Sequence, residues 1–341
     1  MVERLQIEEP GAWDSALHTL PQPHIMQSWN WGELKVPQGW DVRRFLWQNT
    51  DHPIAAAQLL ILQRGRFRLG YVPKGPTVDW NDESCVVEVL QGLEALARQE
   101  SLLLLKIDPD VIASSPGGEV LVAKLRGRGW HYSFEQIQFP NTMVIDLQAE
   151  LDLILARMKA KGRYNIRLAV RKGVTVRAAT LADLPLLVDM YAETAQREHF
   201  KIREPAYYRD TWRSFLQSET GHGFVAEVGG EPVAMLIMLH FGKRAWTMYA
   251  GSYNRHRTTM PTYLLQWEAL RHAQSLGCTT YDMWGAPNDL DERDPLWGVY
   301  RFKSSFGAEL ISHIGAFDYP PHAWMYRYFI LLHSRMATLV R

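Results

Sequence analysis

The sequence has few of the features that mark extracellular, membrane-spanning or strongly charged proteins. Its 341 residues include only 2 cysteines, Cys85 and Cys278, which are too few for a disulfide framework and fit a reducing compartment. The acidic N-terminal stretch contains no apolar run of the kind found in secretion signals, and no apolar run reaches the length of a membrane span. Because 37 basic residues balance 37 acidic ones, net charge points to no partner. We therefore expect a cytoplasmic protein.

Common metal and nucleotide motifs are missing as well. The 12 histidines show neither HExxH nor a paired His/Cys spacing, and there is no EF-hand loop, so no metal site is predicted. The sequence also lacks a P-loop and a GxGxxG turn. What remains is a folded globular composition, 47% hydrophobic and 22% charged, in a chain that fits two domains better than one. Its 13 tryptophans suggest an extended aromatic binding surface.

Two parts of the chain carry the same order of predicted elements, namely strands, then a helix, then a closing strand. The alternating and near-continuous apolar patterns predict these elements in the first part at 43–47, 54–63, 68–71, 83–100 and 101–107. In the second part they predict them at 224–227, 233–240, 245–251, 262–276 and 279–283. Such an ordered set indicates an internal duplication of one α/β unit.

Matching residues favour the same duplication. Asp108 and Asp282 each follow a Glu-Ala-Leu triplet at the same distance, and Tyr71 corresponds to Tyr249 at nearly the same offset. The repeated plan is that of the acyl-CoA N-acyltransferase (GNAT) fold. In acetyltransferases of that fold, a glycine-rich turn before the long helix holds the CoA pyrophosphate on backbone N–H groups. Here the equivalent segment, 254–261, has no glycine, and Pro261 lacks an N–H. We therefore expect the fold to be kept and the acyl donor to differ from CoA.

A lysine in an aromatic segment is the first candidate for chemistry. Lys303 lies close in sequence to Trp297, Tyr300, Phe302 and Phe306. A cation in a partly dry site of this kind would stabilise a developing oxyanion. The alternative is a surface lysine whose stem packs on the aromatic rings while its head stays in water.

Basic residues are concentrated in the segment 151–173, although the whole chain is neutral. Its spacing predicts two short helices bent near Gly162. The segment would bind the phosphates of a nucleotide or of an RNA backbone, or else form a solvated helical face. The apolar, basic tail 320–341 predicts a C-terminal helix packed on the protein, with a membrane-surface helix as the alternative.

A further helix is predicted to begin at Pro205, with Arg203 just before it and Tyr207 one turn inside. An arginine beside a helix N-terminus is well placed to bind a phosphate or a carboxylate. An arginine at such a position also commonly serves the structure alone.

Short stretches in order along nearly the whole chain carry a resemblance to a known family. They are QSWNWGELK, GYVPKGP, SFEQIQFPNTMVIDL, MKAKGRYNIRLAVRKGV, MYAETAQREHFKIR, MYAGS, MPTYLLQWEALRHA, YDMWGAP and GVYRFKSSFG. In these stretches the sequence resembles the FemABX family of peptidoglycan bridge-forming aminoacyltransferases. The resemblance implies two GNAT-like domains, 1–146 joined by 315–341, and 147–314. Some members insert a coiled-coil arm, for which this chain has no room.

The resemblance also implies a reaction. An amino acid of the glycine, alanine or serine type would pass from aminoacyl-tRNA to the side-chain amine of the stem peptide of a peptidoglycan precursor. The acceptor would be lipid II or UDP-MurNAc-pentapeptide, without CoA, a metal or another cofactor. Peripheral contact with the inner membrane face would be compatible with a lipid-linked acceptor.

Residue by residue, the resemblance assigns candidate roles. It implies that Lys35 binds the acceptor and that Arg203 contacts a phosphate, with the family's tyrosine one turn later at Tyr207. Three further family positions match this sequence. They are the tyrosine after the central strand of the second unit (Tyr249), the Phe-Lys pair (Phe302 and Lys303) and the aspartate that closes the first unit (Asp108). Of these, Lys303 would stabilise the oxyanion. Asp108 would act as the general base or cap the end of its strand. If Asp108 is not the base, the leaving ribose or a substrate phosphate would accept the proton of the attacking amine.

Two other functions fit the same residues. One is an aminoacyl-tRNA–protein transferase of the same fold, which modifies protein N-termini. The other is a non-catalytic protein that binds cell-wall precursor or RNA. Assays with charged tRNA and either a peptide or a muramyl acceptor distinguish these functions.

Overall fold

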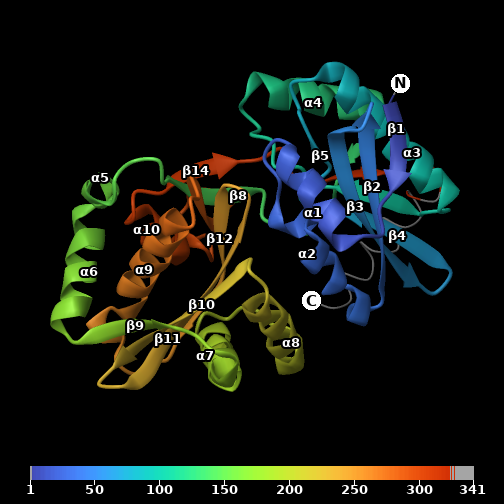
Figure 1. Cartoon of the computed structure of the whole chain (residues 1–341). Helices are drawn as coiled ribbons and strands as arrows, with labels where there is room; N and C mark the ends of the chain where they lie inside the picture. Colours follow the sequence, from blue (N-terminus) through green and yellow to red (C-terminus); the bar gives the residue numbers. More distant parts are fainter. Residues whose placement is uncertain (1, 323, 325, 327–341) are drawn as a thin grey trace. The chain divides into compact units, whose positions relative to one another are not determined.

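The computed structural model describes residues 2–322, 324 and 326, which form two compact units (Figure 1). The first unit takes the chain up to Pro140 and the described residues from Ser312 onward, and the second is Asn141–Ile311. The expected boundary after residue 146 lies at the far end of a strand, β8 (Asn141–Asp146), that pairs within the second unit. The predicted C-terminal helix falls largely outside the described residues. No described helix combines the length and apolar character needed to cross a membrane.

The first unit is built on a mixed sheet in the order β1-β2-β3-β4-β6-β15-β7, with β5 paired to β3. Its strands are β1 (Val2–Gln6), β2 (Trp40–Asn49), β3 (His52–Arg64), β4 (Phe67–Val72), β5 (Thr77–Val78), β6 (Leu104–Ile107), β7 (His131–Tyr132) and β15 (Phe317–Tyr319). Only the pair β4 and β6 is parallel among these described ladders. The sheet is completed by β15, which arrives after the second unit and pairs with β6.

Helices cover both faces of this sheet, because successive side chains of its central strands point to opposite faces and both faces are apolar enough to be buried. They are α1 (Pro10–Thr19), α2 (Trp29–Glu33), α3 (Glu83–Gln99) and α4 (Pro116–Gly127), with short 3-10 turns η1 (Ile25–Gln27) and η2 (Val36–Gln38). In β3, Leu59 and Ile61 join the core beneath α3, while Gln58 points to the other face. There its amide donates to the carbonyls of Met26 and Ser28, which fixes the chain around η1 and α2.

The second unit repeats the plan with the strand order β14-β8-β13-β12-β11-β10-β9. Its further strands are β9 (Val174–Ala178), β10 (Gly221–Val228), β11 (Glu231–Phe241), β12 (Arg244–Ser252), β13 (Thr280–Gly285) and β14 (Glu309–Ser312). Its helices are α5 (Leu151–Arg157), α6 (Ala160–Arg171), α7 (Leu184–Arg197), α8 (Pro205–Gln217), α9 (Pro261–Ser275) and α10 (Trp297–Ser304), with 3-10 turns η3 (Leu181–Asp183) and η4 (Arg257–Thr259). Here β12 and β13 are the parallel pair, joined by α9.

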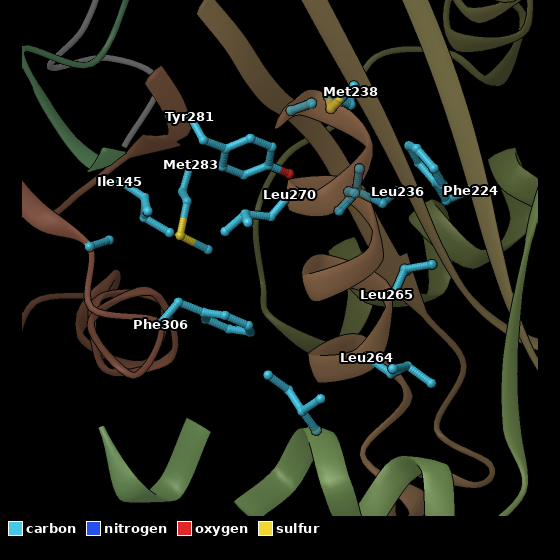
Figure 2. Close-up of a cluster of buried hydrophobic side chains, with 14 of the residues drawn as sticks. Ile145, Phe224, Leu236, Met238, Leu264, Leu265, Leu270, Tyr281, Met283 and Phe306 are labelled. Atoms are coloured by element: carbon cyan, nitrogen blue, oxygen red, sulfur yellow. The ribbon is translucent and has the colours of Figure 1, made fainter. Parts of the chain in front are cut away.

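The core of the second unit lies between the sheet and α9. Helix α9 packs on β9, β10 and β11 with α6 beside it, whereas α7 and α8 pack on the strands β10 to β12. Figure 2 shows Leu264 and Leu270 of α9 within the same cluster as Tyr281 and Met283 of β13, together with Phe306. This core holds the closing strand β13 and the chain after α10 in fixed positions.

The two strand orders correspond element by element, which confirms the predicted tandem GNAT-like architecture. Each predicted strand or helix of the two repeats overlaps an observed one. The match of Asp108 with Asp282 is wrong, however. Asp282 lies inside β13 opposite Trp246, whereas Asp108 follows the end of β6, and the register equivalent of Asp282 is Lys106, opposite Tyr71. The error arises because α9 continues further past its Glu-Ala-Leu triplet than α3 does.

The bend predicted near Gly162 is also misplaced. The chain breaks at Met158 and Lys159, between α5 and α6, and Gly162 lies in the first turn of α6. A Cβ atom at Gly162 would come within 2.2 Å of the carbonyl oxygen of Ser305. The glycine therefore allows a close approach of two backbones and does not mark a bend.

Candidate functional site

Lys303 is buried at the point where two parallel strands separate. The ladder between β12 and β13 ends at the pair Trp246 and Asp282, although both strands continue beyond it. Beyond that point the carbonyl oxygens of Trp284 and Gly285 accept hydrogen bonds from Lys303 Nζ at 2.7 and 2.6 Å. The side chain comes from α10 and is only 9% exposed. The ammonium group is thus inside the unit, and the alternative of a lysine with its head in water is wrong.

Burial changes the acid–base behaviour of this lysine. Desolvation lowers the pKa of Lys303 from 10.5 to about 7, and the nearby charge of Asp282 acts in the opposite direction. Two of the three N–H donors of an ammonium are engaged by the two backbone carbonyls. Such a group can be charged near neutral pH and still direct a donor at a substrate.

The backbone that holds Lys303 is itself fixed by Asp282. This carboxylate is 1% exposed and accepts a hydrogen bond from the backbone N–H of Trp284 at 2.7 Å. Thr142 Oγ1 and Arg244 donate to the same side chain. Trp284 has a φ of 64°, a left-handed conformation that is costly for a tryptophan. The network around Asp282 stabilises that turn, and with it the two carbonyls.

Tyr249 belongs to an aromatic cluster on the opposite face of the same unit's sheet from α9. Its ring lies 5.8 Å from that of Tyr191, 5.9 Å from Tyr208 and 5.4 Å from Trp212. Burial raises the pKa of Tyr249 well above 10, so the phenol stays neutral. Like Trp284, it lies beyond the last paired residues of β12 and β13.

Arg203 and Tyr207 lie at the start of α8 and adjoin this cluster. The guanidinium of Arg203 stacks 4.6 Å from the ring centre of Tyr207, which lies 5.2 Å from the ring of Tyr208. The backbone N–H of Arg203 donates to the Tyr208 hydroxyl at 3.1 Å. Arg203 is exposed. The cation is therefore exposed and positioned by aromatic stacking, an arrangement that suits an anionic ligand.

Phe302 has a packing role within the unit. Its ring lies 5.0 Å from that of Tyr263 on α9 and 5.1 Å from that of Phe306. These contacts fix α10 against α9 and thereby orient the adjacent Lys303.

In the first unit, Lys35 follows α2 and is half-buried. Its Nζ lies 4.6 Å from the ring centre of Trp31, a cation–π contact that holds the side chain in one direction. Behind it, Arg44 stacks on Trp29 at 3.4 Å and donates to Gln58. The aromatic residues of the stretch QSWNWGELK thus order a basic group at the edge of α2.

Asp108 lies after β6 in the first unit and is 3% exposed. The Tyr71 hydroxyl donates to one of its oxygens at 2.7 Å, and the backbone N–H of Lys74 donates to the other. Burial raises the pKa of Asp108 to about 6, against the opposing effects of the Lys74 charge and the Tyr71 hydrogen bond. The Lys74 ammonium pairs with Asp110 at 3.0 Å. Asp108 therefore closes a hydrogen-bonded turn after its strand.

The predicted residues thus fall into separate groups. Arg203, Tyr207 and Tyr249 lie together around α8 and β12, while Phe302 and Lys303 lie together on α10 of the same unit, and Lys35 and Asp108 belong to the first unit. The sequence interpretation missed the aromatic partners Tyr191, Tyr208 and Trp212 and the supporting network of Asp282. The i,i+4 spacing of Tyr208 and Trp212 on α8 was the available signal for the cluster.

The segment before α9 differs from an anion-binding turn. His256 and Met260 have φ values of 59° and 58° on the two sides of η4. The backbone N–H groups of Thr259 and Met260 donate to the carbonyls of His256 and Arg257 at 2.9 and 3.0 Å. Pro261, which starts α9, has no N–H. The positions Thr259, Met260 and Pro261 therefore offer no free amide donor.

Comparison with known proteins places these features in a family. The model of the FemAB family matches residues 13–228 and 219–334. The lipid II:glycine glycyltransferase of Staphylococcus saprophyticus is 22% identical over 96% of this chain and 95% of its own length. The enzyme of the same name from Staphylococcus aureus is 22% identical over 90% of both chains.

Solved structures show the same fold. A crystal structure of FemX superposes with a TM-score of 0.85, at 21% identity, over 93% of this chain and 97% of that chain. A tandem GNAT protein from the clavulanic acid biosynthesis pathway superposes with a TM-score of 0.53, at 14% identity, over 94% of this chain and 99% of the other.

Proposed function

Because this chain belongs to the FemAB family and is thereby an aminoacyltransferase, we propose that it builds peptidoglycan interpeptide bridges. It transfers an amino acid of the glycine, alanine or serine type from aminoacyl-tRNA to the side-chain amine of the stem peptide. The acceptor is lipid II or its UDP-linked form, UDP-MurNAc-pentapeptide. The names of relatives that match over nearly their full length support the class of acceptor. The observation that carries the chemistry is Lys303, buried and bonded to two backbone carbonyls.

In the proposed reaction, the acceptor amine attacks the carbonyl carbon of the aminoacyl ester. A C–N bond forms, the carbonyl oxygen becomes negatively charged, and the C–O bond to the ribose then breaks. The third donor of the Lys303 ammonium group is directed at that oxyanion. Because the carbonyls of Trp284 and Gly285 fix the lysine beforehand, no reorganisation is needed as charge develops.

The proton lost by the amine needs an acceptor. Asp108 is a candidate base, with a cap at the end of its strand as the alternative, and its two oxygens already accept hydrogen bonds from Tyr71 and Lys74. We therefore assign the proton to the ribose oxygen that leaves, which becomes a hydroxyl. With this assignment, the proton that the attacking amine loses is gained by the leaving alkoxide, and the reaction balances without a further group.

The acceptor carries a diphosphate, for which Arg203 is the proposed contact, with Tyr207 beside it. The guanidinium is exposed and stacked on the ring, so its donors are oriented before the ligand binds. Lys35 is the proposed acceptor contact of the first unit, with Trp31 holding its side chain. Tyr249 supports Arg203 through the aromatic cluster.

An aminoacyl ester is preferred as the donor over a CoA thioester. In support, the amide groups of Thr259 and Met260 are bonded to carbonyls within their own turn and Pro261 has none. A pyrophosphate at this helix start would find no free amides from these three positions. We propose that the reaction uses neither CoA nor a metal.

A transfer assay tests the proposed function. Purified protein is incubated with tRNA charged with glycine, alanine or serine and either lipid II, UDP-MurNAc-pentapeptide or a peptide with a free N-terminus. Mass spectrometry should show one added residue on the muramyl acceptor, on the side-chain amine of its diamino acid. Modification of the peptide alone would identify a protein transferase. Binding of precursor without any product in all combinations would contradict an enzymatic role.

A further inference from the structure

The second unit exposes a basic face on α6 that the proposed chemistry does not use. Lys161, Arg167, Arg171 and Lys172 are all exposed on this helix or at its end. Asn165, Ile166 and Ala169 are buried on the opposite side. No aspartate or glutamate occurs in the sequence between Leu153 and Ala182. The cations therefore share one face of a helix that carries no acid of its own.

Among the described residues, no neighbouring element neutralises the charges of this face. The nearest pair is that of Arg157 on α5 with Asp146, at 3.7 Å and with both side chains more than half exposed. In the described part of the chain, no carboxylate forms an ion pair with any of the four α6 cations. Elsewhere in the unit, Arg177 and Arg271 are paired with acidic side chains. A run of uncompensated cations in an otherwise balanced unit implies an anionic partner.

An aromatic side chain lies among these cations. Tyr164 is 56% exposed, and the guanidinium of Arg171 lies 5.8 Å from its ring centre. A bilayer would call for an apolar stripe opposite the cations, but the opposite face of α6 is buried in its own unit. Cations interspersed with an exposed tyrosine suit a nucleic acid, whose phosphates contact the cations and whose bases stack on the ring.

Helix α6 is joined directly to the helix that carries Lys303. The backbone N–H of Lys159 donates to the Ser305 carbonyl at 3.1 Å, and Lys159 Nζ donates to Ser304 Oγ at 3.3 Å. Gly162 lets the α6 backbone approach that same carbonyl. The N-terminal end of α6 therefore lies against the end of α10, where Ser304 directly follows Lys303.

We infer that the exposed face of α6, formed by Lys161, Tyr164, Arg167, Arg171 and Lys172, binds the RNA backbone of the aminoacyl donor. This inference rests on the proposed function and adds the place where the body of the tRNA is held. The cations contact successive phosphates of the acceptor arm, and the 3′ end with its ester continues toward Lys303. Discrimination between amino acids is left to the site itself, since phosphate contacts carry no such information.

The test compares a variant in which the four cations are neutralised (K161Q/R167Q/R171Q/K172Q) with a charge-matched control (R64Q/R66Q/R126Q/K243Q). The control residues are exposed and lie on other elements. Fluorescence anisotropy with uncharged tRNA should show a dissociation constant at least about tenfold higher for the α6 variant than for the control. The slope of log K against log salt should fall by about three, since each lost phosphate contact removes roughly 0.7 to 0.9.

A short donor separates binding of the RNA body from chemistry. The aminoacyl ester of adenosine carries the reacting bond without the acceptor arm. With this donor, the α6 variant should match wild type in turnover, whereas with full-length aminoacyl-tRNA its KM should rise and its kcat should stay. An equal loss with both donors would mean that the substitutions disturb α10, and would overturn the inference.

The remaining outcomes are also decisive. An unchanged tRNA affinity and salt slope in the α6 variant would overturn the inference, as would loss of binding to phosphatidylglycerol vesicles with tRNA binding intact. If wild type bound tRNA through α6 and formed no product with any acceptor, the proposed function would fail while the RNA-binding surface stood. If product formed normally with the α6 variant at limiting tRNA, the function would stand and the surface would not.

Discussion

The two units share one strand order, yet the ends of their parallel strands differ. In the first unit, β4 and β6 remain paired to the end, with Val72 opposite Ile107, and Asp108 then closes the turn. In the second unit, β12 and β13 lose their pairing after Trp246 and Asp282, and a lysine from α10 binds the freed carbonyls. The same scaffold thus yields a closed end in one copy and an open, cationic end in the other.

The supporting charges differ in the same way. In the first unit, Lys106 in β6 pairs with Asp318 of the neighbouring β15 at 2.7 Å, and Ser133 shares both partners. At the equivalent place in β13, Asp282 binds Arg244 and the backbone of Trp284. The buried pair of the first unit stabilises the sheet, whereas that of the second holds an unusual turn. The first copy thus has a structural network where the second has the proposed site.

The largest effect is expected at Lys303. Replacing Lys303 with Met keeps the stem and removes the cation, so kcat should fall by about a hundredfold or more. The acceptor Kd should stay within about twofold, because truncating one donor aimed at the transition state leaves ground-state contacts in place. The control is Lys243→Met, an exposed lysine of the same unit. Turnover comparable to wild type would remove Lys303 from the mechanism.

A smaller effect is expected at Arg203. Arg203→Gln removes a charge-assisted contact to the acceptor diphosphate, so the acceptor KM should rise about tenfold, equivalent to about 1.4 kcal/mol. The kcat should change little. Steady-state kinetics with Arg209→Gln, an exposed arginine on α8, the helix that follows Arg203, gives the reference. Equal KM values for the two variants would show that the diphosphate binds elsewhere.

The corresponding change in the first unit should affect stability more than chemistry. Asp108→Asn leaves one acceptor oxygen for two donors, Tyr71 and the Lys74 amide, and should cost about 1–3 kcal/mol of unfolding free energy. Thermal unfolding measures this loss, and kcat of the folded variant should remain near that of wild type. A loss of kcat of a hundredfold with unchanged stability would instead identify Asp108 as the base.

The carboxyl group of Asp108 should also make the stability difference between wild type and Asp108→Asn depend on pH. Burial raises the folded pKa of Asp108 from 3.8 to about 6, so the protonated form favours the folded state. Its contribution to stability is therefore present below about pH 4 and is lost as the pH rises to about 6. The unfolding free energy of wild type should therefore approach that of Asp108→Asn as the pH rises from about 4 to about 6. A difference that grows with pH would contradict the burial effect.

Much of the fold could be predicted from local patterns. The near-continuous apolar runs of β3 and β11 and the apolar stripe of α9 predicted those elements, because burial decides local structure. The pairing of β15 with β6 could not be predicted, since it joins residues more than two hundred positions apart and β15 has only three residues. The match of Asp108 with Asp282 was wrong for a related reason. The sequence does not show how far each helix continues past its Glu-Ala-Leu triplet.

The site was predictable in its residue types and less so in its contacts. The aromatic segment around Lys303 allowed either a cation in a dry site or a surface lysine, and the structure shows the buried one. The rings of Phe302 and Phe306 pack on Tyr263, however, and backbone carbonyls bind the ammonium. A left-handed tryptophan at 284 has no sequence signal. Such contacts depend on where β12 and β13 separate, which is a property of the assembled sheet.

The pH dependence of a single turnover tests the role of the buried ammonium at the open end of β13 most directly. Lys303 should lose its proton as the pH passes about 7, so the wild-type rate should stop rising there and then fall. In Lys303→Arg, the guanidinium stays charged, and the rate should keep rising to about pH 9 as the acceptor amine deprotonates, whatever its absolute value. Coincident profiles for the two proteins would contradict the account.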